Sequence, residues 1–73
     1  MKKVIVVAGM DNMPMGSAVL RILQGVSGVD KVKLKLEEES VVVEYGRGAI
    51  TEDELCDAIN EEGFEVVDIF DEG

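Results

Sequence analysis

The clearest structural signal is the succession of VIVVA (4–8), GMDNMPMG (9–16) and SAVLRIL (17–23). Apolar residues at consecutive positions predict a strand over residues 3–8 that is covered on both faces. Residues 16–26 place apolar side chains on one stripe, which predicts an amphipathic helix. The loop between them therefore connects a strand to a helix, and it carries three of the chain's four methionines.

A β-hairpin is predicted after this unit. Residues 30–37 alternate between apolar and mostly lysine side chains, as expected of a strand with one buried face. The lysines suit an exposed sheet edge because they oppose pairing with a further strand. After a turn at residues 38–40, residues 41–45 form the returning strand.

The remainder of the chain predicts a second helix and a last strand. Thr51 and Glu54 have the spacing of a capping box, in which each side chain binds the other residue's backbone N–H. Gly63 ends this helix. Residues 64–70 then form the final strand.

The predicted element order is β-α-β-β-α-β, the split βαβ pattern of ferredoxin-like folds. We therefore predict an α+β sandwich in which one four-stranded antiparallel sheet carries both helices on one face. The length of 73 residues fits a single domain, residues 1–73. No apolar run approaches the roughly 18 residues of a membrane span. The N-terminal residues lack the pattern of a signal peptide, so the expected location is the cytoplasm.

Composition excludes several classes of function. The chain has no histidine and one cysteine, Cys56, so Ser-His, Cys-His and histidine-based zinc chemistry and an intrachain disulfide are ruled out. Residues 1–36 carry a net charge of +4 (six basic, two acidic) and residues 37–73 carry −13 (one basic, 14 acidic). An acidic surface disfavours nucleic acid, whose phosphates require basic side chains. No pair of carboxylates is expected in a pocket, so we do not predict an enzyme.

The chain resembles the heavy-metal-associated domain family, which includes small copper and mercury chaperones and the N-terminal modules of metal-pumping P-type ATPases. The resemblance covers residues 4–67. It rests on the loop start Gly9-Met10, the first-helix positions Val19, Leu23 and Val26, the helix-ending Gly28-Val29, the following strand Val32-Lys33-Leu34, the second-helix positions Leu55 and Ile59, and the pair Gly63-Phe64. It implies the same fold that the pattern predicts.

The family's defining motif is Gly-Met-x-Cys-x-x-Cys, whose two thiolates bind Cu(I), Hg(II), Zn(II) or Cd(II). In this chain Asn12 stands at the first cysteine position and Met15 at the second. The resemblance therefore implies a metal loop that lacks its thiolates. Zinc, cadmium and mercury binding of the family's kind is not expected, because those ions depend on thiolate charge.

The loop still contains soft donor atoms. Thioethers suit Cu(I) and Ag(I), so Met13 and Met15 are the candidate metal ligands, with an oxygen from Asp11 or Asn12. Methionine is also an ordinary apolar gap-filler, and this alternative stays open for both residues. For Met10 we expect packing, because the matching methionine of the family tucks under the loop.

Two residues outside the loop bear on this site. Cys56 is expected to be a partly exposed bystander on the second helix, with an intermolecular disulfide or stray metal binding as minor alternatives. Phe64 matches a family position beside the metal loop. It would either shield Met15 from water or belong to the core.

Two hypotheses of function follow. In the first, the domain binds or traffics Cu(I) through Met13 and Met15 and docks on a metal-transporting P-type ATPase or another metal-handling protein, with its acidic face steering toward a basic surface. In the second, it has lost the metal and acts by protein–protein docking or as a homodimer, with an apolar interface around Val42 on the helix-free face of the sheet. A designed chain with deliberately changed ligands is a third interpretation.

Overall fold

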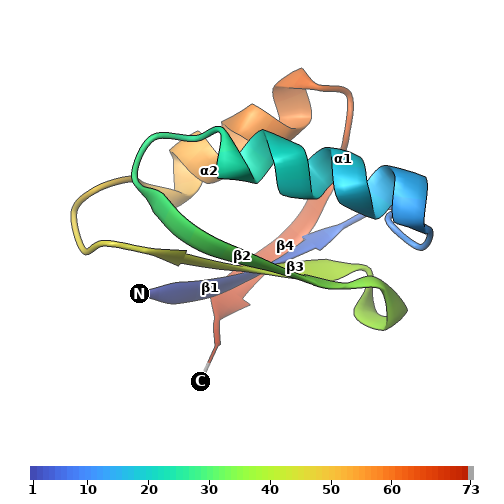
Figure 1. Cartoon of the computed structure of the whole chain (residues 1–73), viewed down its shortest axis with the longest axis horizontal. Coiled ribbons are helices and arrows are strands. Elements are labelled where there is room, and N and C mark those ends of the chain that lie inside the picture. Colours follow the sequence, from blue (N-terminus) through green and yellow to red (C-terminus); the bar gives the residue numbers. More distant parts are fainter. Residues whose placement is uncertain (73) are drawn as a thin grey trace.

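The computed structural model describes residues 1–72 and has the predicted order of elements. These are β1 (Lys2–Val7), α1 (Met13–Gln24), β2 (Val29–Lys35), the short 3-10 helix η1 (Leu36–Glu38), β3 (Ser40–Tyr45), α2 (Glu52–Glu61) and β4 (Val66–Asp71). The strands form one antiparallel sheet in the order β2-β3-β1-β4. Both helices cover the same face of this sheet (Figure 1). The predicted ferredoxin-like sandwich is confirmed.

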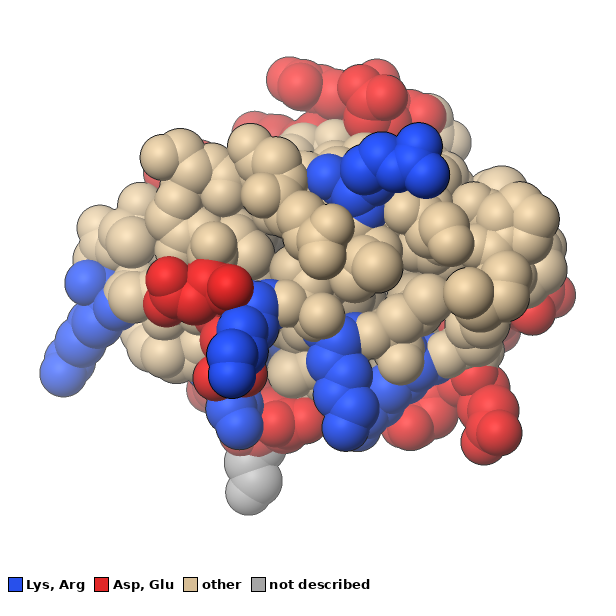
Figure 2. Space-filling model, viewed as in Figure 1, with Lys and Arg blue, Asp and Glu red and all other residues tan. Residues whose placement is uncertain are grey.

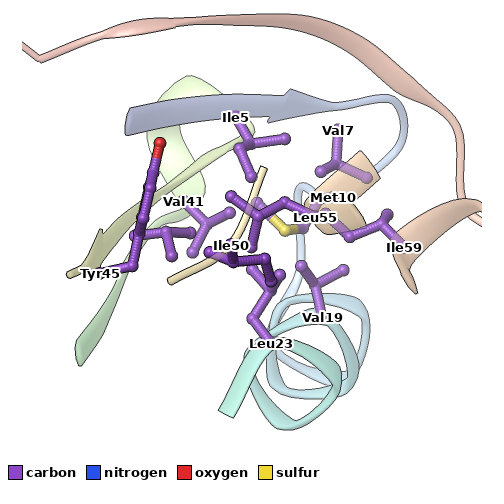
Figure 3. Packing of buried hydrophobic residues seen from close by; sticks show 11 residues of the cluster. Ile5, Val7, Met10, Val19, Leu23, Val41, Tyr45, Ile50, Leu55 and Ile59 are labelled. Atoms are coloured by element: carbon purple, nitrogen blue, oxygen red, sulfur yellow. The ribbon is translucent and has the colours of Figure 1, made fainter. Parts of the chain in front are cut away.

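The core lies between the sheet and the two helices (Figure 3). β1 and β3 are the central strands, and their alternate residues face the helices. The buried cluster consists of Ile5, Val7, Met10, Val19, Leu23, Val41, Val43, Tyr45, Ile50, Leu55 and Ile59. Of the stripe predicted for the first helix, Val19 and Leu23 are buried in this cluster and Val26 packs against it, whereas Ile22 is half-buried outside it.

α1 begins earlier than predicted, at Met13 rather than at residue 16, and it ends at Gln24 rather than at residue 26. The cause is local. Asn12 is extended and caps the helix with its side chain, and Pro14 stands in the first turn, where its missing N–H and fixed φ are tolerated. Because this first turn adds little to the apolar stripe, periodicity alone did not reveal it.

The hairpin and the last strand also differ at their ends. β2 ends at Lys35, and η1 occupies part of the region predicted as strand and turn. Glu39 then takes the left-handed conformation with φ 49° and returns the chain into β3. β4 starts two positions later than predicted, at Val66, whose N–H donates to the Asn60 side-chain oxygen at 3.3 Å.

α2 starts after Thr51 as predicted, with one change in the capping box. The Glu54 N–H donates to Thr51 Oγ1 at 3.2 Å, as expected. The Glu54 carboxylate, however, accepts the Thr51 hydroxyl at 3.2 Å instead of the Thr51 backbone N–H. The acidic side chains of this first turn also complement the positive end of the helix dipole.

Gly16 allows α1 to lie close to the end of the β2 strand. A Cβ atom built at Gly16 would lie 2.7 Å from a methyl carbon of Leu34 and 2.7 Å from one of Leu36. The absence of a side chain at this position therefore fixes how closely the start of α1 approaches β2 and η1.

The two edge strands are protected in different ways. β2 carries the predicted lysines, so it presents a positively charged edge. At the opposite edge, the Asp68 carboxylate accepts the N–H of Ile69 in β4 at 2.9 Å. Lysines and satisfied N–H groups both discourage another chain from adding a strand.

Val42, around which we expected an apolar interface on the helix-free face of the sheet, is nearly covered, although Phe70 on the same face is 47% exposed. Val42 and its neighbour Val4 are only 5% and 8% exposed. The Glu72 carboxylate lies 4.0 Å from Lys2 Nζ and 3.8 Å from Lys35 Nζ, so charged side chains extend across this face from β4 to β2. Their aliphatic portions can cover apolar surface while the charges stay in water, and the prediction for Val42 is wrong.

Charge is distributed unevenly over the molecule. Figure 2 shows most of the visible basic side chains along the lower side of the molecule, interspersed with acidic ones, while a further group of acidic side chains lies above the helix layer. Within residues 1–72, neither helix is long and apolar enough to cross a membrane.

Candidate metal site at the start of α1

The segment between β1 and α1 is a short loop that ends in a capped helix. After β1, Gly9 adopts φ +77°, and the Met10 N–H donates to the Val7 carbonyl at 3.3 Å. The Met10 side chain is fully buried among core residues, where Figure 3 shows its sulfur. The expected packing role of Met10 is confirmed.

Asn12 is committed to the helix start. Its Oδ1 accepts the Met15 N–H at 3.0 Å, and its Nδ2 donates to Asp11 Oδ1 at 3.2 Å. The amide oxygen retains one lone pair for another partner. Asn12 and Asp11 therefore lie side by side at the site, but the amide's first role is to satisfy a backbone N–H that the helix leaves unpaired.

The two candidate thioether ligands lie in the first turn of α1, not in the loop where they were predicted. Residues two apart on an α-helix are separated by about 200° around its axis, so the side chains of Met13 and Met15 leave the helix on different sides. Met13 is 59% exposed, whereas Met15 is half-buried and packs against the core cluster. The structure thus places both sulfur-bearing side chains at one helix end without directing them at each other.

Met13 faces a shallow pocket of about 430 Å³. Its other lining residues are Leu34, Lys35, Leu36, Glu37 and Glu38. Sequence reasoning did not anticipate that η1 lies beside Met13. The available signal was Gly16, three positions later on the same helical face, which the structure shows in close contact with Leu34 and Leu36.

Positions 12 and 15, where the family resemblance implies cysteines, lie three residues apart at the helix start. Residues at this spacing share one face of a helix. In this chain they present a neutral amide oxygen and a neutral thioether. Such a pair can hold a soft monovalent ion weakly but lacks the negative charge that two thiolates would supply.

Phe64 and Cys56, the two candidate residues outside the loop, are both half-buried. Phe64 packs against the core cluster. Cys56 lies on α2. Its burial raises the pKa of the thiol, and the carboxylates of Asp53, Glu52 and Asp57 raise this pKa further. Because only the thiolate is a strong metal ligand, Cys56 is a poor competitor for a metal ion.

No group of three or more histidine, cysteine, aspartate or glutamate side chains in the described part of the chain is arranged to hold a metal ion. Asp11 is the carboxylate next to the capping residue, and Glu37 and Glu38 line the pocket that Met13 faces. The soft donors of the site are its two thioethers, which suit Cu(I) better than zinc or a hard cation.

Comparison with models of known protein families finds no match. Among curated proteins, the copper chaperone CopZ of Staphylococcus epidermidis is 34% identical over 65 residues, which span 89% of this chain and 96% of that protein. The copper chaperone CopZ of Enterococcus hirae is 42% identical over 40 residues, which span 55% of this chain and 58% of that protein.

Among solved structures, the chain is also similar to copper-handling proteins. A structure described as the CopZ metallochaperone has a TM-score of 0.84 and 30% identity, covering 92% of this chain and all of that one. A copper-binding domain from HMA7, a P-type ATPase, also has a TM-score of 0.84, with 27% identity over 96% of this chain and 95% of that one. On the identity to a CopZ protein over nearly the whole of both chains, and on these shared structures, the chain belongs to the heavy-metal-associated family of copper-chaperone-like domains.

Proposed function

We propose that this domain carries Cu(I) and releases it to a partner, using the thioether sulfurs of Met13 and Met15 as its ligands. The observation that carries the proposal is the exposure of Met13, a residue that is 59% exposed at the helix end where the family's metal motif aligns. Thioethers are soft neutral donors that match Cu(I). Membership in a family of copper chaperones supports copper as the metal.

The arrangement of the ligands favours transfer of the copper ion to a partner over its storage. Met13 is open to solvent, so a ligand from a partner can reach a copper ion bound there. Met15 is half-buried and must leave its packing against the core to join as a second ligand, which its flexible side chain allows. An amide oxygen from Asn12 or a carboxylate oxygen from Asp11 would complete a weak site. The domain would act as a carrier and not as a catalyst.

A metal-handling protein is the expected partner. The likeness to a copper-binding domain of a P-type ATPase supports a transporter of this class. Cu(I) would pass from one domain to the other by stepwise ligand exchange at the start of α1. The cytoplasm, where soluble chaperones of this type meet such domains, is the proposed location.

A competition titration tests the copper site. Cu(I) is added under anaerobic conditions to the protein and a chromophoric chelator, while backbone NMR shifts are followed. We expect one equivalent of copper to be drawn from the chelator and to shift residues 9–17. The variant Met13→Ala/Met15→Ala should lose this competition, and Met13→Ala alone should lose more than Met15→Ala because the Met13 sulfur is already accessible.

Three control variants make the outcome specific. Met1→Ala removes an equally exposed methionine elsewhere, and Cys56→Ser removes the thiol; neither should change copper binding. Asn12→Cys/Met15→Cys restores the thiolate pair of the family motif and should tighten binding by several orders of magnitude. Absence of competition by the native chain, or its loss in Cys56→Ser alone, would contradict the proposal.

A second candidate function is docking without metal. It is favoured by the divergence of Met13 and Met15 and by the engagement of Asn12 in the helix cap. In that case the domain would recognise a protein partner or a second copy of itself. Sedimentation analysis over a range of concentrations without copper would reveal a homodimer directly.

A further inference from the structure

A groove runs between the two helices on the outer side of the helix layer. Its volume is about 650 Å³. The floor is made of half-buried apolar side chains, namely Ala18, Ile22, Val26, Ala58 and Phe64. The remaining lining residues are Arg21, Gly25, Glu61 and Glu62. The groove belongs to the middle and end of α1, beyond the turn that carries the candidate metal ligands.

The spacing along α1 explains the apolar floor. Ala18 and Ile22 are four residues apart on α1 and form one row along the helix. Val26 follows just beyond the helix end, where its N–H donates to the Leu23 carbonyl at 3.1 Å. This row lies next to the buried row that contains Val19 and Leu23. Together with Val26 this row forms a second apolar strip that no other element of the described chain covers fully.

Small residues keep the groove open. Ala18 and Ala58 each contribute only a methyl group from their respective helices. Gly25 at the end of α1 contributes no side chain, although a Cβ atom there would meet nothing closer than the carbonyl oxygens of Ile22 and Arg21, at 3.5 and 3.6 Å. Its φ of −83° is also accessible to other residues. A glycine is therefore not required by the backbone at this position, and its effect is to leave space.

The charge around the groove has one dominant sign. From Gly48 to Glu72 the sequence contains no lysine or arginine. Glu61 and Glu62 stand at the α2 end of the groove, and Arg21 is the single basic residue on the α1 side. A cationic partner would be attracted to the acidic side, while Arg21 offers a place for one acidic residue of that partner.

We propose that this groove binds an amphipathic α-helix of a partner protein whose polar face is rich in lysine and arginine. An apolar floor between two helices suits the apolar face of a third helix, which presents anchors at positions i, i+4 and i+7. A second copy of this chain is a poor occupant, because α1 has one basic residue and α2 has none. The inference does not depend on copper binding and is tested on metal-free protein.

A model peptide tests the groove on the whole chain without metal. The probe is a fluorescently labelled Leu/Lys amphipathic helix of about five turns, measured by fluorescence anisotropy at about 0.15 M salt. We expect saturable binding that shifts the NMR signals of the floor residues. A peptide of identical composition with the amphipathic pattern scrambled should bind much more weakly.

Two pairs of matched variants decide the location. Gly25→Leu fills the groove, and its control, Gln24→Leu, adds the same side chain at the neighbouring exposed position outside it. Glu61→Gln/Glu62→Gln removes two charges at the groove, and Glu37→Gln/Glu38→Gln removes two charges on η1. The groove variants should weaken binding by about tenfold, and the controls by less than about twofold. Backbone NMR spectra verify that each variant is folded.

The proposal fails in two distinct ways. Equal weakening by the two double variants would mean that the peptide senses net charge alone. Equal binding of the scrambled peptide, or full binding by folded Gly25→Leu, would mean that the apolar floor is not used. Neither result would affect the copper titration, which probes the opposite end of α1.

Discussion

Lys3 is a basic side chain that the fold buries almost completely. Its ammonium group lies 2.6 Å from the Glu52 carboxylate and 2.5 Å from that of Asp71. One residue therefore links the start of β1 to the first turn of α2 and to the end of β4. Hydrogen bonds from Asp71 and then Glu52 raise the pKa of Lys3 above its ordinary value of 10.5, against the opposing effect of burial.

The raised pKa of Lys3 predicts a specific alkaline response. A raised pKa contributes stability that is complete below pH 10.5 and is lost as the pH rises toward the folded-state value, because the unfolded chain releases the proton first. Urea unfolding should therefore show that native protein exceeds Lys3→Met in stability by a constant amount at neutral pH, and that this difference shrinks above pH 10.5. A difference that stays constant through strong alkali would contradict the assignment.

At the residue scale, the sequence allowed some roles to be predicted and hid others. The burial of Met10 followed from the family resemblance, and the structure agrees. The divergence of Met13 and Met15 could not be foreseen, because it depends on the register of the first helical turn. The start of the helix is fixed by the hydrogen bond that the Met15 N–H donates to the Asn12 side-chain oxygen, and this bond leaves no trace in apolar periodicity.

At the scale of elements, α2 offers a simple test of how much a capping side chain stabilises a helix. It has 10 residues and buries Leu55 and Ile59, so its start depends on the Thr51 cap. Thr51→Ala removes the acceptor of the Glu54 N–H and should lower the free energy of unfolding by about 1 kcal/mol. Thr51→Ser keeps a hydroxyl and should remain within a few tenths of native. Chemical denaturation of both variants checks this, and equal losses would show that the hydroxyl is not the cause.

The order and type of the elements were predictable because helices and strands place their apolar residues at different intervals along the sequence. The alternation of β2 and the helical stripes of α1 and α2 are local properties, and the structure confirms them. The ends of elements were less predictable, since they depend on contacts such as Asn60 to Val66. The charged side chains near Val42 include Lys35 at the end of β2, at one edge of the sheet, and Glu72 just after β4, at the other edge. Contacts so distant in sequence cannot be inferred from local pattern.

At the scale of the whole molecule, the net charge of −9 has a measurable consequence. Acidic side chains crowd the helix layer and repel one another more in the folded state than in the expanded chain. Salt screens this repulsion over distances of about 10 Å at 0.1 M. Raising sodium chloride should therefore increase the melting temperature by a few degrees. Glu61→Gln/Glu62→Gln should show a smaller increase, and a melting temperature that falls with salt would contradict the argument.

The position of β1 has a consequence for synthesis. β1 is made first, yet it lies in the centre of the sheet between β3 and β4, and β4 is made last. During synthesis, β1 therefore keeps one edge unpaired until β4 has been made. A nascent chain truncated before Val66 would expose that edge, so proteolysis of stalled ribosomal complexes should become resistant only once β4 has left the exit tunnel.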